Sequence, residues 1–269
     1  MKHLFMLLCL VLVGPLLCGV AGAGDRIPLP GGVQYYRFAS AVDGPEAVWV
    51  NPSALGRYQD FTIQYIGEYY DDKLLKSWGY VVSDRGGGIA YRKLDNFLGV
   101  EYREYIFAFG TEIGRENHIG GSYRYVTEGA GIYDKRHFWN VGLLFSQNPK
   151  WSLAAVFSNL NRGRVDGERT DIEQVYAATY RQLRDRLRLS MAINLSTGQS
   201  LSSADYMYGA EFLAHPKVTL YANIDDNSNF EIGARVNLIN YILGGQTRID
   251  REGNHLGSPL YISFYPLQK

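Results

Sequence analysis

The chain has little cysteine, no net charge and no long hydrophobic run after its first residues. Cys9 and Cys18 are its only cysteines. Without the segment that holds them, the chain has no thiol for a disulfide or a cysteine-based metal site. The 27 basic and 27 acidic residues balance, which argues against nucleic-acid binding, because a nucleic-acid-binding protein needs a basic face. No later run approaches the ~20 apolar residues of a membrane-spanning helix.

The first 23 residues have the pattern of a secretory signal. Lys2 and His3 precede an apolar run at 4–13, Pro15 follows, and 21–23 reads Ala-Gly-Ala. This pattern predicts cleavage near Ala23, which removes one basic residue and leaves 26 against 27. A membrane anchor is the first alternative, but the apolar run is too short for a span. Lipidation at Cys18 is the second, but residues 15–17 differ from the Leu-x-Gly/Ala pattern before a lipidated cysteine.

Alternation of apolar and polar residues dominates the chain after residue 59. The composition, with 21 Tyr, 12 Phe, 4 Trp and 30 Gly, favours an aromatic-rich β protein. In 230–238, for example, Phe230, Ile232 and Ala234 alternate with Glu231 and Gly233. A β-sandwich would also alternate, but its strands are typically ~5–6 residues long. The alternating runs here last about 9–11 residues, the length of a tilted strand that crosses a bilayer.

The sequence therefore predicts an all-β fold: a transmembrane antiparallel β-barrel of about fourteen strands, which occupies residues 58–269. Predicted short turns alternate along the chain with longer connections such as 129–135, 161–170, 196–203 and 251–257. This parity is typical of an outer-membrane barrel with short periplasmic turns. The predicted strands are 61–70, 75–82, 87–93, 99–113, 118–128, 136–147, 151–160, 171–182, 186–195, 204–214, 217–224, 229–238, 241–250 and 258–266.

Residues 24–57, which precede the barrel, are predicted to form a hatch inside it. Asp43 is expected to cap a short helix that has Pro45 in its first turn. Asn51 is expected to end that helix, because the residue before a proline, here Pro52, avoids the α region. The apolar side chains of this segment would face the wall, and Trp49 would need a partner for its indole N–H if buried.

The segment 39–56 resembles the amino-terminal hatch of FadL/PorV-type outer-membrane proteins. That family has a run of small residues, an Asp, an Ala and then Asn-Pro-Ala-x-Leu, and this chain has Ser53 where the family usually has Ala. The resemblance implies a barrel of the same strand number, and this shorter chain is most similar to the small PorV/PorQ-like members. The matching positions, with Trp49 added as the aromatic residue of the segment, are Asp43, Ala47, Asn51, Pro52, Ala54 and Leu55.

Charged residues on the polar faces of the predicted strands should point into the lumen. One interpretation is that they pair with one another and brace the wall and the hatch. The other is that they line a polar substrate path. These predicted lumen charges are Glu68, Glu104, Arg124, Arg188, Glu211, Glu231, Arg235 and Arg248.

No catalytic, metal or cofactor site is predicted. The histidines are scattered and form no cluster with a serine and a polar partner. The acidic and amide residues at 225–229 read as a polar turn rather than a calcium loop. Large aromatic residues are expected mostly at the membrane interfaces: Tyr35, Tyr36, Trp78, Tyr102, Trp139, Trp151 and Tyr261.

Two functional hypotheses follow. In the first, the protein lies in the outer membrane among its lipids and binds or passes small hydrophobic molecules. In the second, it is a non-transporting barrel that acts as a shuttle or scaffold for a secretion or envelope-assembly protein. A soluble periplasmic β protein is the third possibility, and nucleic acid is not an expected partner.

Overall fold

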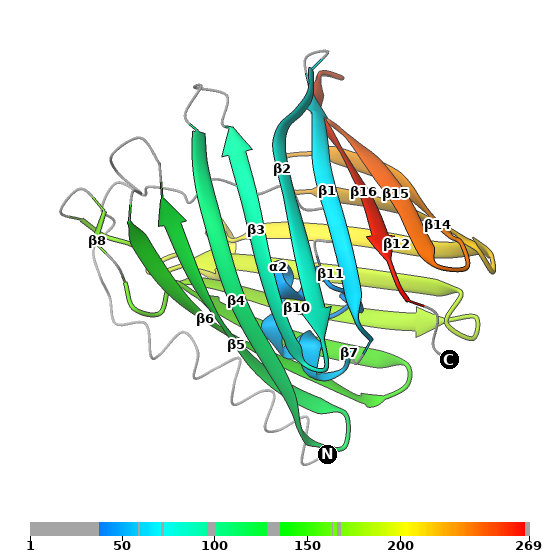
Figure 1. Cartoon of the computed structure of the whole chain (residues 1–269), viewed down its shortest axis with the longest axis horizontal. Coiled ribbons are helices and arrows are strands. Elements are labelled where there is room, and N and C mark those ends of the chain that lie inside the picture. The colour runs from blue at the N-terminus through cyan, green and yellow to red at the C-terminus, as the bar shows by residue number, and fades with distance from the viewer. Residues whose placement is uncertain are drawn as a thin grey trace.

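The computed structural model describes residues 38–58, 60–70, 73–95, 101–127, 135–162, 164–165 and 168–266. Within them, fourteen strands form one closed antiparallel barrel (Figure 1), as the sequence predicts. The predicted signal segment, its cleavage position and residues 24–37 lie outside the described residues. The barrel strands are β1 Thr62–Tyr70, β2 Lys73–Asp84, β3 Gly87–Asp95, β4 Glu101–Gly114, β5 Asn117–Thr127, β6 Arg136–Asn148, β7 Trp151–Ser158, β10 Glu173–Gln182, β11 Leu187–Ser196, β12 Asp205–His215, β13 Val218–Asp225, β14 Phe230–Asn237, β15 Tyr241–Ile249 and β16 His255–Phe264.

Strand pairing follows chain order around the wall and closes between its first and last strands. Ile63 of β1 lies opposite Phe264 of β16, and that register continues to Tyr69 opposite Ser258. Strand β7 pairs directly with β10, because the two intervening strands form a separate hairpin. Among the described residues, no helix is long and apolar enough to cross a membrane.

The structure corrects two details of the predicted connections. The connection 161–170, expected to be a loop, holds a hairpin of β8 (Arg164–Val165) and β9 (Glu168–Arg169). Strand β16 begins at His255, three residues earlier than predicted, because Gly257 and His255 pair with Arg248 and Ile249 across an irregularity in register. A short 3₁₀ helix, η2 (Leu201–Ser203), lies in another long connection.

Short turns gather at one end of the barrel, along the lower and right-hand edges of Figure 1. The β2–β3 and β4–β5 turns each have two residues between the strands, and positive φ angles at Arg85, Gly86, Arg115 and Glu116 allow the reversals. We call this end the short-turn end. The described connections 197–204 and 250–254 are longer and lie at the opposite end, in the alternation of short and long connections that the sequence predicts.

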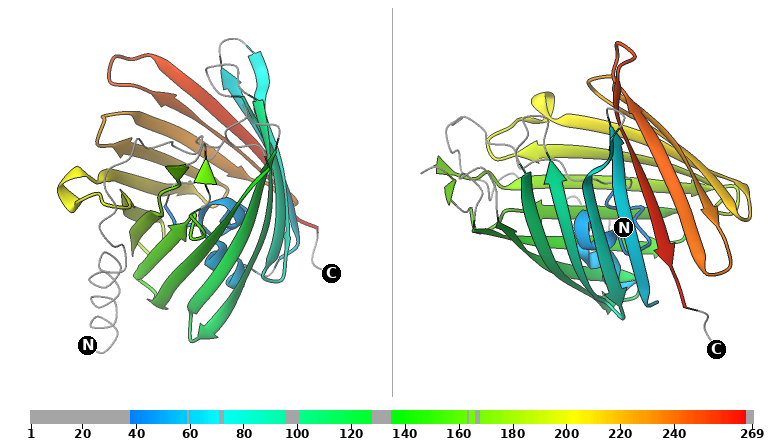
Figure 2. Two further views of the ribbon diagram at one scale, coloured as in Figure 1. Left: turned by 90° about the vertical axis from the view of Figure 1, so that its left-hand side faces the viewer. Right: turned by 45° about the horizontal axis from the view of Figure 1, so that its top comes forward.

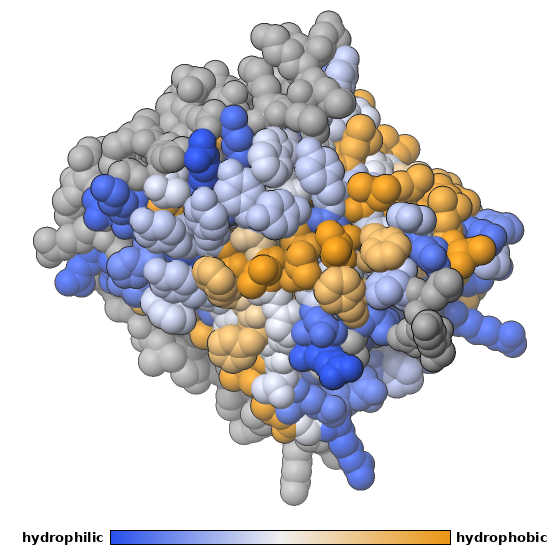
Figure 3. Space-filling view, viewed as in Figure 1, coloured by the Kyte–Doolittle hydropathy of each residue, from blue (hydrophilic) through white to orange (hydrophobic). Residues whose placement is uncertain are grey.

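The outward face carries an apolar band. Phe107 and Phe109 of β4 and Ile89 of β3 are exposed on the outside of the wall. Over β1–β4, hydrophobic side chains cross the middle of the molecule, with hydrophilic side chains on both sides of them (Figure 3). Such a band, with polar borders, is what a barrel presents to lipid.

The large aromatic residues divide between the outward face and the lumen. Trp139 and Trp151 are exposed on the outward face, and Trp78 stacks against the exposed Tyr65. For Tyr261 the prediction is wrong: it is only 4% exposed and faces the lumen, because its neighbours Leu260 and Ile262 take the outward positions of β16. Tyr35 and Tyr36, and the side chain of Tyr102, lie outside what the structure describes.

Residues 38–58, which we call the inner segment, lie inside the barrel (Figure 2). They form a one-turn helix, α2 (Ala47–Val50), and a 3₁₀ helix, η1 (Pro52–Gly56). Helix η1 contacts β4, β5 and β6, and α2 contacts β3 and β4. Apolar residues of the inner segment and of the wall therefore form one buried core.

The outward apolar band makes a prediction about stability in a bilayer. Phe107→Arg places a charge within the band and should lower the free energy of unfolding by about 2–4 kcal/mol. The measurement is urea unfolding of protein reconstituted in vesicles. Ile239→Arg is the matched control, since Ile239 is exposed in the β14–β15 turn. Equal losses for both variants would show that Phe107 does not face lipid.

Candidate functional site

Asn51 joins the two helices of the inner segment. Its backbone is extended and ends α2, as the Asn-Pro pair predicts. Its side chain then caps η1, since Asn51 Oδ1 accepts a hydrogen bond from Ser53 N at 3.1 Å and Pro52 takes the first position of that helix. This is the usual chemistry of a helix N-cap, at a helix that the sequence did not predict.

Asn51 also attaches the inner segment to itself and to the wall. The side chain is fully buried. Its Nδ2 donates to Ala39 O at 3.0 Å and lies 3.5 Å from Leu143 O of β6, while Oδ1 also accepts from Ser53 Oγ at 2.6 Å. A buried amide with partners for both of its ends fixes the local conformation, because any rearrangement leaves polar groups unpaired.

Glycines of the wall let the backbone of η1 touch β4 and β5. A Cβ at Gly120 would lie 2.4 Å from the carbonyl carbon of Pro52, and one at Gly110 would lie 2.4 Å from Pro52 O. No residue with a side chain fits such an approach. Ala54 and Leu55 of η1 are buried in the same contact. On this side, the inner segment is packed backbone to backbone.

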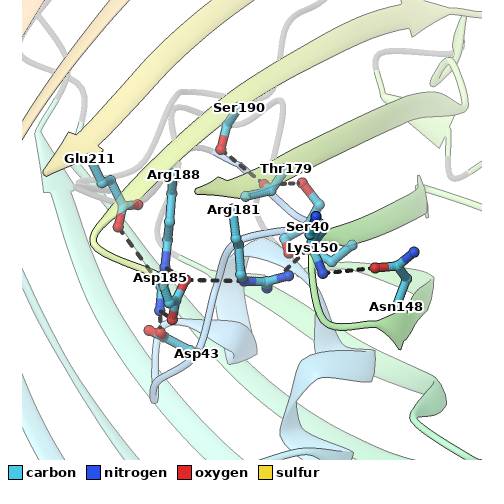
Figure 4. Close-up of polar contacts among 11 residues, drawn as sticks. Ser40, Asp43, Asn148, Lys150, Thr179, Arg181, Asp185, Arg188, Ser190 and Glu211 are labelled. Atoms are coloured by element: carbon cyan, nitrogen blue, oxygen red, sulfur yellow. Dashed lines mark hydrogen bonds and ion pairs between the residues drawn. The ribbon is translucent and has the colours of Figure 1, made fainter. Parts of the chain in front are cut away.

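The beginning of the inner segment is bound to β7 and β10 through hydroxyl groups (Figure 4). Ser40 Oγ lies 2.8 Å from Thr179 Oγ1, which lies 2.9 Å from Ser190 Oγ. Ser152 Oγ donates to Ser40 O at 2.6 Å. All four residues are buried, so these bonds are shielded from water.

Asp43 forms the ionic contact between the inner segment and the other side of the wall, and it is not the predicted helix cap. Helix α2 begins later, after Glu46, with no side chain at its cap. Arg188 Nη1 of β11 donates to Asp43 Oδ2 at 2.9 Å, and Arg235 Nη1 of β14 lies 3.9 Å from Oδ1. Asp43 therefore pairs with arginines from distant strands instead of capping the helix that follows it. Arg188 also pairs with Asp185 at 2.9 Å and lies 3.8 Å from Glu211 (Figure 4).

The charge balance around Asp43 favours its ionised form. Burial alone would raise the pKa of Asp43, but the Arg188 and Arg235 guanidinium groups outweigh burial and hold that pKa below its usual value. The Asp43 side chain is still 32% exposed. The contact is therefore ionic, partly solvated and open to exchange with water.

A cavity of about 250 Å³ separates the inner segment from β14–β16 at the short-turn end. Burial raises the pKa of Tyr58, which lies in its lining, to about 12. Tyr58 Oη is 2.5 Å from Thr62 Oγ1. Gln64 Nε2 of β1 donates to Glu46 Oε1 at 2.5 Å. The lining residues are Asp43, Gly44, Glu46, Tyr58, Asp60, Arg235, Asn237, Ile242, Ser263 and Tyr265.

Trp49 is partly buried against the apolar core of the inner segment. Its Nε1 is buried and has no hydrogen-bond partner in the described part of the chain. Ala47 and Val48 beside it are almost fully buried. Apolar packing therefore holds α2 in place, and the indole N–H lacks the partner that the sequence led us to expect.

The predicted lumen charges divide into two groups. Arg188, Arg235 and Glu211 surround Asp43. The others pair on the wall, away from the inner segment: Glu104 lies between Arg92 and Arg124, with Arg124 Nε at 3.1 Å, and Glu68 pairs with Arg248. Asn223 Nδ2 donates to Glu231 Oε2 at 3.2 Å.

Sequence reasoning missed the contacts that hold the inner segment. Gly110, Gly120 and Gly142 lie at lumen-facing positions of adjacent strands, and such a glycine cluster opposite a short helix is a signal of close approach. The hydroxyl groups of Ser40 and Thr179 gave no local signal. Among the described residues, no group of His, Cys, Asp and Glu side chains is arranged to hold a metal.

Comparison with known proteins shows a shared fold. No family model and no curated protein matches the sequence. Among solved structures, the chain is similar to the Ralstonia pickettii toluene transporter TbuX, with TM-score 0.59, 10% identity and coverage of 84% of this chain and 94% of that one. The monoaromatic hydrocarbon channel CymD matches with TM-score 0.57 and 9% identity, over 85% of this chain and 95% of that one. A Pseudomonas aeruginosa FadL homologue matches with TM-score 0.51 and 9% identity, over 90% of this chain and 99% of that one.

These neighbours are, in turn, a toluene transporter, a monoaromatic hydrocarbon channel and a FadL homologue. At these identities the likeness is one of fold.

Asp43→Asn should weaken the inner segment in a pH-dependent way. Because the pKa of Asp43 is lowered on folding, its contribution is complete above the usual value of 3.8 and is lost as the pH falls through the lower folded value. Wild type should therefore exceed the variant in unfolding free energy by up to about 1 kcal/mol at pH 5–7, and the difference should shrink below pH 4. Asp226→Asn, in the exposed β13–β14 turn, is the control. A difference independent of pH would contradict the ionic role.

Asn51→Ala should free the inner segment from β6. The change removes the side-chain bonds to Ala39 and Ser53 in a buried site and should cost about 2–3 kcal/mol. Hydrogen exchange of the amides in 47–57 should then be at least tenfold faster than in wild type. Asn148→Ala removes one bond, to Lys150 N, in an exposed turn and should leave that exchange unchanged. Unchanged exchange in the Asn51 variant would disprove the anchoring role.

Proposed function

We propose that the protein binds small hydrophobic molecules and passes them across the outer membrane, with the inner segment as a plug at the periplasmic end of the barrel. One observation carries this proposal: the segment is attached unequally to the two sides of the wall. It is packed through backbone contacts on β4 and β5. On the β11 and β14 side it is held by the partly solvated contacts of Asp43, beside a cavity.

The unequal attachment suggests which contacts break first. Separating η1 from Gly110 and Gly120 exposes apolar and backbone groups together, which is costly. Separating Asp43 from Arg188 exposes charges that water solvates again, which is cheap for a partly exposed pair. The plug would therefore swing away from β10–β16 and widen the existing cavity, while it stays bound to β4 and β5.

The substrate class is inferred from the neighbours and from the resemblance of 39–56 to FadL-type hatches. TbuX is a toluene transporter and CymD a monoaromatic hydrocarbon channel. Trp49 and the apolar face of α2 would offer such molecules an apolar contact within the barrel. Monoaromatic hydrocarbons are therefore the first compounds to test.

The second candidate is the shuttle or scaffold barrel of the PorV-like proteins. It is favoured by the charges buried on the lumen wall: Glu104 and Arg92 are almost fully buried in their ion pair. Charges that pair with each other in the wall have a structural role that requires no substrate path through the lumen. In this case the short turns and the cavity beside Tyr58 would face a periplasmic partner protein.

A disulfide that locks the plug tests passage. The chain has no cysteine after Cys18, and Ser40 Oγ lies 2.8 Å from Thr179 Oγ1, so Ser40→Cys with Thr179→Cys places two sulfurs within bonding reach. In vesicles loaded with a toluene-sensitive reporter, the oxidised double variant should lose passage at least fivefold relative to its reduced form. Asp43→Asn should increase passage.

The single variants Ser40→Cys and Thr179→Cys, treated with the same oxidant, are the matched controls. Heat-modifiable migration on a gel checks that each variant is a folded barrel. If wild type, Asp43→Asn and the chain lacking 43–56 were all impermeable, and a pulldown returned a stoichiometric partner, transport would be rejected in favour of the scaffold.

A further inference from the structure

A row of tyrosines crosses the outward face of β2–β5. Tyr80, Tyr91, Tyr105 and Tyr125 lie directly opposite one another in the register of the sheet. Successive ring centroids are 5.5, 5.2 and 6.5 Å apart. Such a row marks the level at which the apolar interior of a membrane meets its headgroups.

The next row, farther from the short-turn end, contains two opposed cations. Lys93 of β3 and Arg103 of β4 are direct cross-strand partners, with Trp78 and Thr127 opposite them on the flanking strands. Like charges at directly opposed positions destabilise a sheet unless an anion offsets them. Both cations are half-buried. Both also interact within the chain, so an added anion would share them with protein groups.

The depth of the basic row follows from β4. Its outward residues from Ile113 to Tyr105 are apolar or aromatic except for Thr111, and Ile113, Phe109 and Phe107 are strongly exposed. This stretch of nine positions matches the ~9–11 residues that a tilted strand needs to cross the apolar layer. Arg103 is thus placed just beyond that layer, at the level of lipid phosphates on the side of the long connections.

We propose that Lys93 and Arg103 bind the phosphate of a lipid in the outer leaflet. The guanidinium group can hold two phosphate oxygens side by side, and the ammonium group adds a point charge to the same phosphate. Tyr91 and Tyr105 lie one row nearer the short-turn end, where their rings would contact the first part of the acyl chains. The site depends on the placement of the barrel in an outer membrane and not on whether hydrophobic molecules pass through it.

The test uses the full barrel in detergent, titrated with lipid A and read by native mass spectrometry. Lys93→Gln with Arg103→Gln should weaken lipid A binding at least tenfold. Dephosphorylated lipid A should bind wild type as weakly as phosphorylated lipid A binds the double variant. Lys93→Arg with Arg103→Lys keeps both charges and should retain binding within about threefold.

The matched control removes the same charge at the other end of the barrel. Lys150→Gln with Arg184→Gln changes two exposed cations in short turns and should leave lipid A binding unchanged. The proposal is overturned if both glutamine pairs reduce binding equally, or if removal of the phosphates leaves wild-type affinity unchanged. Heat-modifiable migration again shows that each variant remains folded.

Discussion

Backbone hydrogen bonding in lipid is the constraint on which the whole structure depends. Every backbone N–H and C=O at membrane depth needs a partner within the protein, and only a closed sheet provides one for each strand. The pairing of β1 with β16 completes that closure. Once the wall is closed, period-2 alternation sends one face to lipid and the other inward. The charges, the glycines and the inner segment are therefore gathered in one lumen, although they come from distant parts of the chain.

The inner segment takes its position from wall residues without side chains as well as from wall side chains that contact it. Gly110 and Gly120 leave a strip of bare backbone on β4 and β5, and η1 lies on that strip. On the opposite side, contact is made through the Ser40 hydroxyl group, through the Phe38 ring on Gly209, and through long side chains such as Arg188 and Arg235. Close packing on one side and long polar contacts on the other make a segment that has a fixed edge and a releasable edge.

The sequence predicts the parts of this structure that local patterns determine. Strand number, strand limits within a few residues, and barrel polarity follow from period 2 and from turn chemistry, and the end of α2 follows from Asn51 before Pro52. The rest depends on long-range geometry. The role of Asp43 was misassigned because the sequence shows the nearby helix that Asp43 could cap but not that Arg188, 145 residues away, lies within hydrogen-bonding distance of it. Tyr261 was placed on the wrong face because tyrosine is common at membrane interfaces, whereas the alternation of β16 puts position 261 in the lumen.

The two interpretations of the lumen charges can be separated by exposure. Glu104 is 2% exposed and lies between two arginines, and removing one partner of such a buried pair costs about 3–5 kcal/mol, because a charge is left without compensation. Asp43 is 32% exposed, and an ion pair of that kind contributes only about 0–1 kcal/mol. The first pair is suited to brace the wall permanently. The second can open and close at little cost, so a movable contact belongs at Asp43, where the inner segment meets the wall beside the cavity.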